Sequence, residues 1–161
     1  MQTKKRIVVT GSNGQLGKEL KKLAPGLPHP MAIGFEFIFL AKEDLPIHHF
    51  EMLRQYFNVY HPAYLINCAA YTAVDRAETE KERAFQINAE AVGVLAAVCK
   101  EHDTKLVHIS TDYVFDGTAS VPYKEDSPTN PQSVYGASKL EGEKQALLFN
   151  LDTISIRTSW V

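Results

Sequence analysis

The sequence has few features of a secreted or membrane-bound protein. Only 2 cysteines occur among its 161 residues, which excludes a disulfide-rich scaffold, and Cys68 and Cys99 both lie in apolar contexts typical of buried free thiols. No apolar stretch approaches the length of a membrane span, and the apolar run behind the basic start MQTKKR is too short for a signal peptide. We therefore expect a cytoplasmic protein with no membrane partner.

Neither sign of charge predominates in the sequence. The formal net charge is −2, so the composition does not indicate a nucleic acid or an anionic membrane as a partner. The 6 histidines show no metal-ligand spacing, and we predict no metal site from them. What remains is an ordinary globular composition, with 45% hydrophobic residues and a length that suits one domain.

Short apolar runs alternate with helical patterns along the chain. Runs rich in β-branched or aromatic residues predict strands at 6–10, 35–40, 64–68, 105–110 and 153–157. Helices are predicted at 15–24, 47–60, 81–102 and from about 133 onward, with loops at 24–34 and 116–133. This alternation predicts βαβ crossovers, and therefore an α/β fold with a doubly wound parallel sheet. The second loop is long, as functional loops often are.

The first predicted strand runs into a glycine-rich turn, VTGSNGQLG, which opens the first predicted helix. Gly11 permits the tight turn, Gly14 lets the backbone approach a pyrophosphate, and Gly17 allows the helix to pack closely on the strand. The helix N-terminus would offer its N–H groups to the phosphates. The spacing G-x-x-G-x-x-G favours nucleotide binding and differs from a Walker loop, since no G-K-[ST] follows. A glycine turn without a ligand is the alternative.

The end of the second strand bears on the choice of cofactor. An acid at this point binds the ribose hydroxyls of NADH, whereas a base tolerates the 2′-phosphate of NADPH. The strand ends in FLAKED, where Lys42 favours NADPH, but Glu43 and Asp44 follow closely. NADH therefore stays possible, and Lys42 could be an ordinary surface lysine.

The third and fourth strands end in residues that suit a ligand. Ala69 and Ala70 are small enough to let a cofactor lie against the backbone, although core packing would explain them equally well. Ser110 and Thr111 place hydroxyls where a substrate carbonyl could lie, unless they only form a turn.

The stretch SVYGASKLEGEK places Lys139 four residues after Tyr135, so the two would be neighbours on a helix. A nearby ammonium lowers the pKa of a tyrosine from its ordinary value of about 10, which would suit Tyr135 to general acid catalysis. The spacing of Ala137, Leu140, Ala146 and Leu147 predicts the buried face of this helix. An exposed tyrosine beside a solvated lysine is the alternative.

From Arg6 to Val161 the chain resembles the dTDP-4-dehydrorhamnose reductases, a family of the extended short-chain dehydrogenase/reductases. The segments that carry the resemblance are GQLG, NCAAYTAVDRAE, STDYVFDG, VYGASKLEGE and IRTSWV. The resemblance implies a Rossmann-like, three-layer fold. It also implies reduction of the C4 ketone of dTDP-4-dehydro-L-rhamnose to dTDP-L-rhamnose with hydride from NADPH, in nucleotide-sugar and cell-surface polysaccharide synthesis.

The resemblance also implies residue roles. The residues for the cofactor follow the first three strands. Gly14, Gln15 and Leu16 would hold the pyrophosphate, and Asp44 and Leu45 would lie near the adenine. Ala69 and Ala70 would flank the cofactor, with Tyr71 and Thr72 beside it. The residues for the substrate are Tyr71, Thr72, Thr111, Asp112, Tyr113 and Trp160. In the reaction, Thr111 would orient the carbonyl, Tyr135 would be the general acid, and Lys139 would lower its pKa and bind the nicotinamide ribose. Asn88 lies near the position of the helix asparagine of the superfamily.

The chain departs from the family in two ways. Cys68 stands where the family usually has alanine. The family also continues beyond TSWV into a C-terminal substrate-binding lobe, so residues 1–161 are expected to form an NAD(P)-binding Rossmann domain without that lobe. We expect this chain to be weakly active at most, and to self-associate as a homo-oligomer. Glu19 is a candidate ligand for the magnesium of some family members, a question that the sequence leaves open.

Two other functions remain possible. A non-catalytic nucleotide-binding subunit, like the regulatory partner of methionine adenosyltransferase, could keep the same fold and motifs. A related sugar-nucleotide reductase or epimerase would use the same residues on another sugar.

Overall fold

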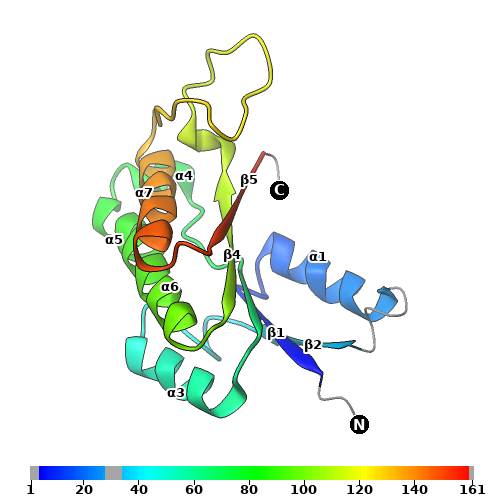
Figure 1. The fold of residues 1–161 in the computed structure, drawn as a ribbon. Coiled ribbons are helices and arrows are strands. Elements are labelled where there is room, and N and C mark those ends of the chain that lie inside the picture. The colour runs from blue at the N-terminus through cyan, green and yellow to red at the C-terminus, as the bar shows by residue number, and fades with distance from the viewer. Residues whose placement is uncertain (1–3, 28–33, 160–161) are drawn as a thin grey trace.

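The computed structural model describes residues 4–27 and 34–159. Its strands are β1 (Lys5–Thr10), β2 (Phe35–Leu40), β3 (Tyr64–Asn67), β4 (Lys105–Thr111) and β5 (Ile154–Thr158). They form one parallel sheet in the order β2-β1-β3-β4-β5 (Figure 1). The prediction of a doubly wound α/β fold is confirmed, and each predicted strand end lies within one residue of the observed one. The strand order reverses beside β1, which is where such sheets bind ligands.

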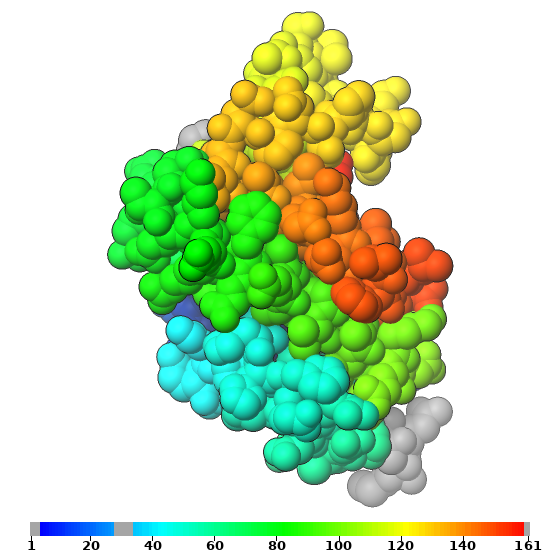
Figure 2. Space-filling view, turned by 90° about the vertical axis from the view of Figure 1, so that its left-hand side faces the viewer, coloured from blue at the N-terminus to red at the C-terminus, as the bar shows by residue number. Residues whose placement is uncertain are grey.

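The helices form two unequal layers. On one face of the sheet lies α1 (Gln15–Leu23), and on the other lie α3 (Phe50–Tyr60), α6 (Ala91–Glu101) and α7 (Val134–Phe149) (Figure 1). The short helices α4 (Val74–Ala77) and α5 (Lys81–Phe85) precede α6. Figure 2 shows the layer of α3, α6 and α7, with the segment 116–133 projecting beyond it. No helix in the described part of the chain is long and apolar enough to cross a membrane.

The helix predicted at 81–102 is interrupted. Between α5 and α6, residues Gln86–Glu90 form a π-helical turn. The helix predicted at 47–60 starts later than expected, because Ile47 and His48 belong to the preceding turn and His49 is the N-cap of α3. Both differences have the same cause: the apolar spacing of a segment does not show where the hydrogen-bond pattern changes.

The buried face of α7 differs from the prediction. Ala146 is fully buried, but Leu147 is 43% exposed. The buried positions of the helix are instead mostly small or polar: Gly136, Ser138, Lys139, Gly142, Glu143 and Ala146. An added Cβ on Gly142 would overlap the carbonyl oxygen of Asn88, so the close approach of α7 to the π-helical turn requires glycine there.

The apolar core lies between the sheet and the three-helix layer. Val8, Leu65 and Leu106 from neighbouring strands pack against Leu53 and Phe57 of α3, and all five are fully buried. Side chains of this size each contribute about 1.5–3 kcal/mol on burial. The core therefore anchors the strands whose carboxyl ends carry the site.

A buried polar network crosses three strands near their carboxyl ends. The hydroxyl of Thr10 donates to Oδ1 of Asn67 (2.8 Å), and Nδ2 of Asn67 donates to Nδ1 of His108 (3.1 Å). Burial lowers the pKa of His108 well below its ordinary value, and the nearby Lys139 lowers it further. The neutral imidazole therefore acts as a hydrogen-bond acceptor that fixes β1, β3 and β4 side by side.

Candidate active site

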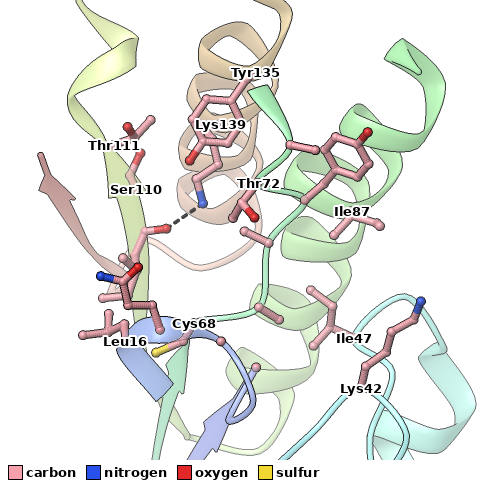
Figure 3. A pocket seen from close by; sticks show the side chains of 18 of the residues that line it. Leu16, Lys42, Ile47, Cys68, Thr72, Ile87, Ser110, Thr111, Tyr135 and Lys139 are labelled. Atoms are coloured by element: carbon pink, nitrogen blue, oxygen red, sulfur yellow. Dashed lines mark hydrogen bonds between the residues drawn. The ribbon is translucent and has the colours of Figure 1, made fainter. Parts of the chain in front are cut away.

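A cleft of about 940 Å³ opens at the carboxyl ends of the strands (Figure 3). Its lining residues follow all five strands, from Gly11 after β1 to Thr158 at the end of β5, and include Tyr135 and Lys139 of α7. This is the crevice in which open parallel sheets bind their ligands. The parallel sheet thus gathers most of the site residues that the sequence predicts.

The glycine turn forms one end of the cleft. Gly11 has a φ of +67°, and a Cβ there would lie 2.6 Å from the backbone nitrogen of Ala69. Gly17 is buried, and a Cβ there would overlap the carbonyl oxygen of Gly11, so Gly17 supports the turn without lining the cleft. Gly14 lines the cleft and is the N-cap of α1, whose first turn has no side-chain cap. The bare backbone at Gly14 leaves room for a ligand at the helix N-terminus.

The end of β2 contributes Lys42 to the cleft, but not Asp44, the acid expected near the adenine. Lys42, Glu43 and Leu45 line the cleft, and Lys42 lies across it from Tyr135 (Figure 3). Asp44 does not line it, because its carboxylate turns back to accept a 2.8 Å hydrogen bond from the backbone nitrogen of Ala41. Asp44 therefore closes the turn after β2 in this structure.

The segment after β3 lies along the floor of the cleft. Cys68, Ala69 and Ala70 line it, followed by Tyr71 and Thr72. Burial raises the pKa of Cys68 to about 11, so its thiol is protonated at neutral pH. Small side chains here keep the floor close to the backbone.

Asn88 holds this segment in place. Its Oδ1 accepts from the backbone nitrogen of Tyr71 (2.8 Å), and its Nδ2 donates to the carbonyl of Tyr71 (3.0 Å) and to the hydroxyl of Ser138 (3.0 Å). Asn88 is 1% exposed and belongs to the π-helical turn. The amide therefore ties the Tyr71 backbone to α7 and does not reach the cleft, which it does not line.

The end of β4 places hydroxyl and carboxylate groups opposite α7. Thr111 caps the 3₁₀ turn Asp112–Val114 by accepting from the nitrogen of Tyr113, and its hydroxyl donates to the carboxylate of Asp112 (3.2 Å). The ring of Tyr113 packs edge-on against that of Tyr135, with centroids 5.7 Å apart. The turn role that the sequence allowed for Thr111 is real, and it coexists with a place in the cleft.

The phenol of Tyr135 points into the cleft toward Thr111 (Figure 3). Burial raises the pKa of Tyr135 above its ordinary value of 10.0, and the nearby carboxylate of Asp112 adds to this increase. The nearby hydroxyl of Thr111 acts in the opposite direction, but the net shift is upward. This differs from the lowering that the Tyr135–Lys139 spacing suggested.

Lys139 explains the difference. Its ammonium donates a 2.6 Å hydrogen bond to the backbone carbonyl of Ile109 in β4 (Figure 3). The side chain is 2% exposed, and burial lowers its pKa from 10.5 to about 8, against an opposing effect of Glu143. Lys139 is therefore a buried cation in the wall of the cleft, directed toward β4.

Several lining residues were not singled out from the sequence as site residues. They come from the edges of the same segments: Asn13, Ile47, His48, Ala73, Val74, Arg76, Arg83, Ile87, Ile109 and Thr158. Thr158 ends β5, so the rule that ligands gather at the carboxyl ends of parallel strands would have found it. Arg76 lies outside the predicted helices and Arg83 lies near the start of the helix predicted at 81–102, and no sequence signal places either of them in the cleft.

Two expectations concern residues elsewhere. Trp160 lies outside the described residues. Glu19 lies on α1, where its carboxylate pairs with Lys22 at 2.6 Å, and the described residues contain no group of three His, Cys, Asp or Glu that could hold a metal ion.

The sequence matches the family model of the RmlD substrate binding domain over residues 5–161. The chain belongs to this family. Among curated members of similar sequence, the dTDP-4-dehydrorhamnose reductase of Burkholderia thailandensis is 44% identical over 97% of this chain and 50% of the relative. The chain thus spans about half the length of the curated relatives that it matches.

Solved structures of RmlD-like proteins have the same fold. A dTDP-4-dehydrorhamnose reductase from Clostridium acetobutylicum superposes with a TM-score of 0.89 at 41% identity, over 96% of this chain and 53% of the other. One from Bacillus anthracis, solved in complex with NADP, gives 0.90 at 36% identity, over 99% and 55%. The family resemblance inferred from the motifs is confirmed.

Proposed function

We propose that this chain forms the cofactor-binding and proton-donating part of an oxidoreductase, an NADPH-dependent dTDP-4-dehydrorhamnose reductase. The enzyme would reduce the C4 ketone of dTDP-4-dehydro-L-rhamnose to dTDP-L-rhamnose for polysaccharide synthesis. One observation carries the proposal: Tyr135, Lys139 and Thr111 lie in the same cleft as the glycine turn of Gly11 and Gly14. A Y-x-x-x-K pair alone is a weak signal, but here it faces a nucleotide-type turn.

The residues of the cleft fit a dinucleotide. Gly14 leaves the N-terminus of α1 open toward a pyrophosphate, with Gln15 and Leu16 beside it. Ala69 and Ala70 leave a flat floor, and Leu45 lies with Lys42 at the far end. The B. anthracis relative was solved with NADP, which supports the same cofactor here, with NADH possible. Bound in the cleft, NADPH would supply the hydride.

The protein's own part in the reaction is proton transfer and charge placement. Because the pKa of Tyr135 is raised, its phenol keeps its proton at neutral pH and can donate it to the alkoxide that forms at C4. Thr111 would hydrogen-bond the ketone oxygen beside the phenol. Lys139, with a pKa of about 8, stays mostly protonated at neutral pH and would stabilise the phenolate left behind.

The sugar nucleotide would enter beside Tyr71, Thr72, Asp112 and Tyr113, all of which line the cleft. Trp160 is proposed as a further contact from the family resemblance alone. About half of each relative's length lies outside the matched region, so the identity of the sugar is proposed from the family resemblance. A reductase or epimerase acting on a related sugar nucleotide is the nearest alternative.

A non-catalytic nucleotide-binding subunit is the alternative from a different class. It would need the glycine turn but not a proton donor in the cleft. The phenol of Tyr135, with Thr111 and the buried Lys139 around it, favours the enzyme. Burying an ammonium group lowers the stability of the fold, and a non-catalytic subunit would have no use for a cation at this position. A cytoplasmic location and a homo-oligomeric state complete the proposal; both cysteines are free in the structure, as expected of a reducing compartment.

A chimera tests the proposal directly. Residues 1–161 would replace the matching half of the B. thailandensis reductase, and NADPH oxidation would be followed with dTDP-4-dehydrorhamnose. Turnover in the chimera, lost in its Tyr135→Phe variant, is the expected result. NADPH binding without turnover of this or related sugar nucleotides would favour the non-catalytic subunit. No NADPH binding by the 161-residue chain in calorimetry would remove the proposal.

A further inference from the structure

A buried carboxylate lies behind the cleft and joins three elements. Glu143 of α7 is 5% exposed, and its Oε1 accepts a 2.5 Å hydrogen bond from the hydroxyl of Ser110 in β4. The guanidinium of Arg157 in β5 forms a forked pair with the same carboxylate, with Nη2 2.7 Å from Oε2 and Nε 3.0 Å from Oε1. Such charge-assisted, two-point pairs fix both distance and orientation.

This cluster adjoins the anchor of Lys139. Ser110 follows Ile109, whose carbonyl accepts the hydrogen bond of the Lys139 ammonium. Glu143 follows Lys139 by one helical turn, so both side chains leave the same face of α7 toward β4. Lys139 and Glu143 are therefore hydrogen-bonded to consecutive residues of β4, Ile109 and Ser110.

We propose that Glu143 is a positioning residue: through Ser110 and Arg157 it locks α7 onto β4 and β5, and it holds Lys139 as a cation at the carbonyl of Ile109. This role rests on the proposed reductase function, in which Lys139 must stay charged beside Tyr135. Glu143 itself does not line the cleft, so it would act through the lining residues Lys139 and Ser110.

The other groups around Lys139 cannot supply the same charge. Cys68 after β3 has its pKa raised to about 11, so it is neutral at physiological pH. His108 of β4 is neutral because burial lowers its pKa, and on α7 itself the phenol of Tyr135 is also neutral, since its pKa is raised. Glu143 remains as the nearby anion, and its effect on the Lys139 pKa is upward.

Arg157 limits how much charge reaches Lys139. The guanidinium faces Glu143 from β5, stacks over the ring of Phe115 at 5.0 Å, and extends to the carbonyl of Glu125 in the loop before α7. Arg157 is the ion-pair partner of Glu143, whereas the Lys139 ammonium is hydrogen-bonded to Ile109 and is affected by the carboxylate through its charge. Removing Arg157 would therefore leave more of the negative charge of Glu143 unscreened at Lys139. The two substitutions Glu143→Gln and Arg157→Gln therefore have opposite expected effects on Lys139.

The test is an NMR titration of the 161-residue chain with ¹³C-labelled lysine side chains, which needs neither cofactor nor substrate. The Lys139 signal is the one lost in Lys139→Met. In Glu143→Gln its pKa should fall by about 1 unit or more. In Arg157→Gln it should rise. Glu141→Gln, on the same helix but hydrogen-bonded only to Gln145, is the matched control and should leave the Lys139 pKa unchanged.

An unchanged Lys139 pKa in a folded Glu143→Gln chain would show that the cluster is only a structural ion pair. If circular dichroism shows that this variant is unfolded, Arg157→Gln decides, and a fall or no change there overturns the proposal. The result is separable from the proposed reaction. A chimera without turnover but with the expected Lys139 shifts would remove the reductase and leave the charge coupling of Glu143 and Lys139 in place.

Discussion

The ammonium of Lys139 is bonded to the carbonyl oxygen of Ile109 at 2.6 Å, and the phenol of Tyr135 lies one helical turn away in the same cleft. Lys139 of α7 is thus a buried cation held against β4, and the pKa of Tyr135 is raised. In the structure, Tyr135 is therefore a protonated acid, and Lys139 is a neighbouring cation whose hydrogen bond goes to the backbone of β4.

Lys139 should make stability depend on pH. Its pKa is about 8 in the folded chain and 10.5 when unfolded, so between these values the unfolded chain binds the proton that the folded chain has lost. The contribution of Lys139 to the free energy of unfolding should therefore rise with pH across this window, by about 3 kcal/mol in total at about 1.4 kcal/mol per pKa unit. Above their ordinary pKa of 9.0, the thiols of Cys68 and Cys99 act in the opposite direction, because burial raises their pKa values in the folded chain. Urea unfolding of the chain and of Lys139→Met from pH 7 to 10 measures the difference, and parallel curves would contradict it.

Tyr135→Phe should lower kcat in the chimera by roughly 10²–10⁴, the usual contribution of general acid catalysis. NADPH affinity should change little, because the ring keeps its packing against Tyr113. Stopped-flow kinetics and calorimetry provide the two readouts. Tyr60→Phe, on the exposed side of α3, is the control and should behave as the parent. Near-normal turnover of Tyr135→Phe would show that another group donates the proton.

Lys42→Glu should weaken NADPH binding by about ten-fold or more, as expected for the loss of one charged hydrogen bond to a phosphate. NADH, which lacks the 2′-phosphate, should lose less. Calorimetry of the 161-residue chain with both cofactors measures the ratio of affinities. The matched control is Lys18→Glu, because Lys18 is exposed on α1 and outside the cleft. Equal losses for the two cofactors would show that Lys42 does not recognise the 2′-phosphate.

Gly142→Ala should destabilise the chain by about 1–3 kcal/mol, the usual cost of overpacking. The new methyl group would overlap the carbonyl oxygen of Asn88, which belongs to rigid backbone. Gly93→Ala is the control: its Cβ would lie 3.2 Å from the Cβ of Gln145, a much milder approach than the overlap at Gly142. Thermal unfolding of both variants decides, and equal stabilities would show that the π-helical turn yields easily.

The isolated chain should self-associate through apolar side chains at the end of α7 and on β5. Leu148, Leu151 and Ile154 are 72%, 83% and 58% exposed. Within the described residues, β5 pairs only with β4, and open strand edges promote association. Sedimentation velocity should show oligomers that Ile154→Lys disperses and that Val121→Lys, on the exposed loop, leaves intact. A monomer at all concentrations would refute this.

The positions of the strands, and the meeting of the lining residues at one edge of the sheet, can be predicted from the sequence because both depend on simple periodicity. Runs of β-branched residues give the strands, and parallel connection then brings Gly11, Ala69 and Thr111 to one edge of the sheet. Where individual side chains point does not follow. Asp44 satisfies a local turn, and Lys139 reaches a backbone carbonyl, because each takes the nearest available hydrogen bond. The burial of Glu143 could not be predicted either, because the hydrophobic pattern of a sequence does not show which charged side chains form buried ion pairs.

Gly11 and Thr158 both line the cleft, although almost the whole length of the chain separates them in sequence. A ligand held there contacts both ends of the folding unit at once, so its binding energy is gained only when the entire sheet has assembled. Any compound that occupies the cleft at 100 times its Kd should raise the free energy of unfolding by about 2.7 kcal/mol, provided the unfolded chain does not bind it. A shift in melting temperature can therefore rank sugar nucleotides and cofactors against this chain without any turnover assay.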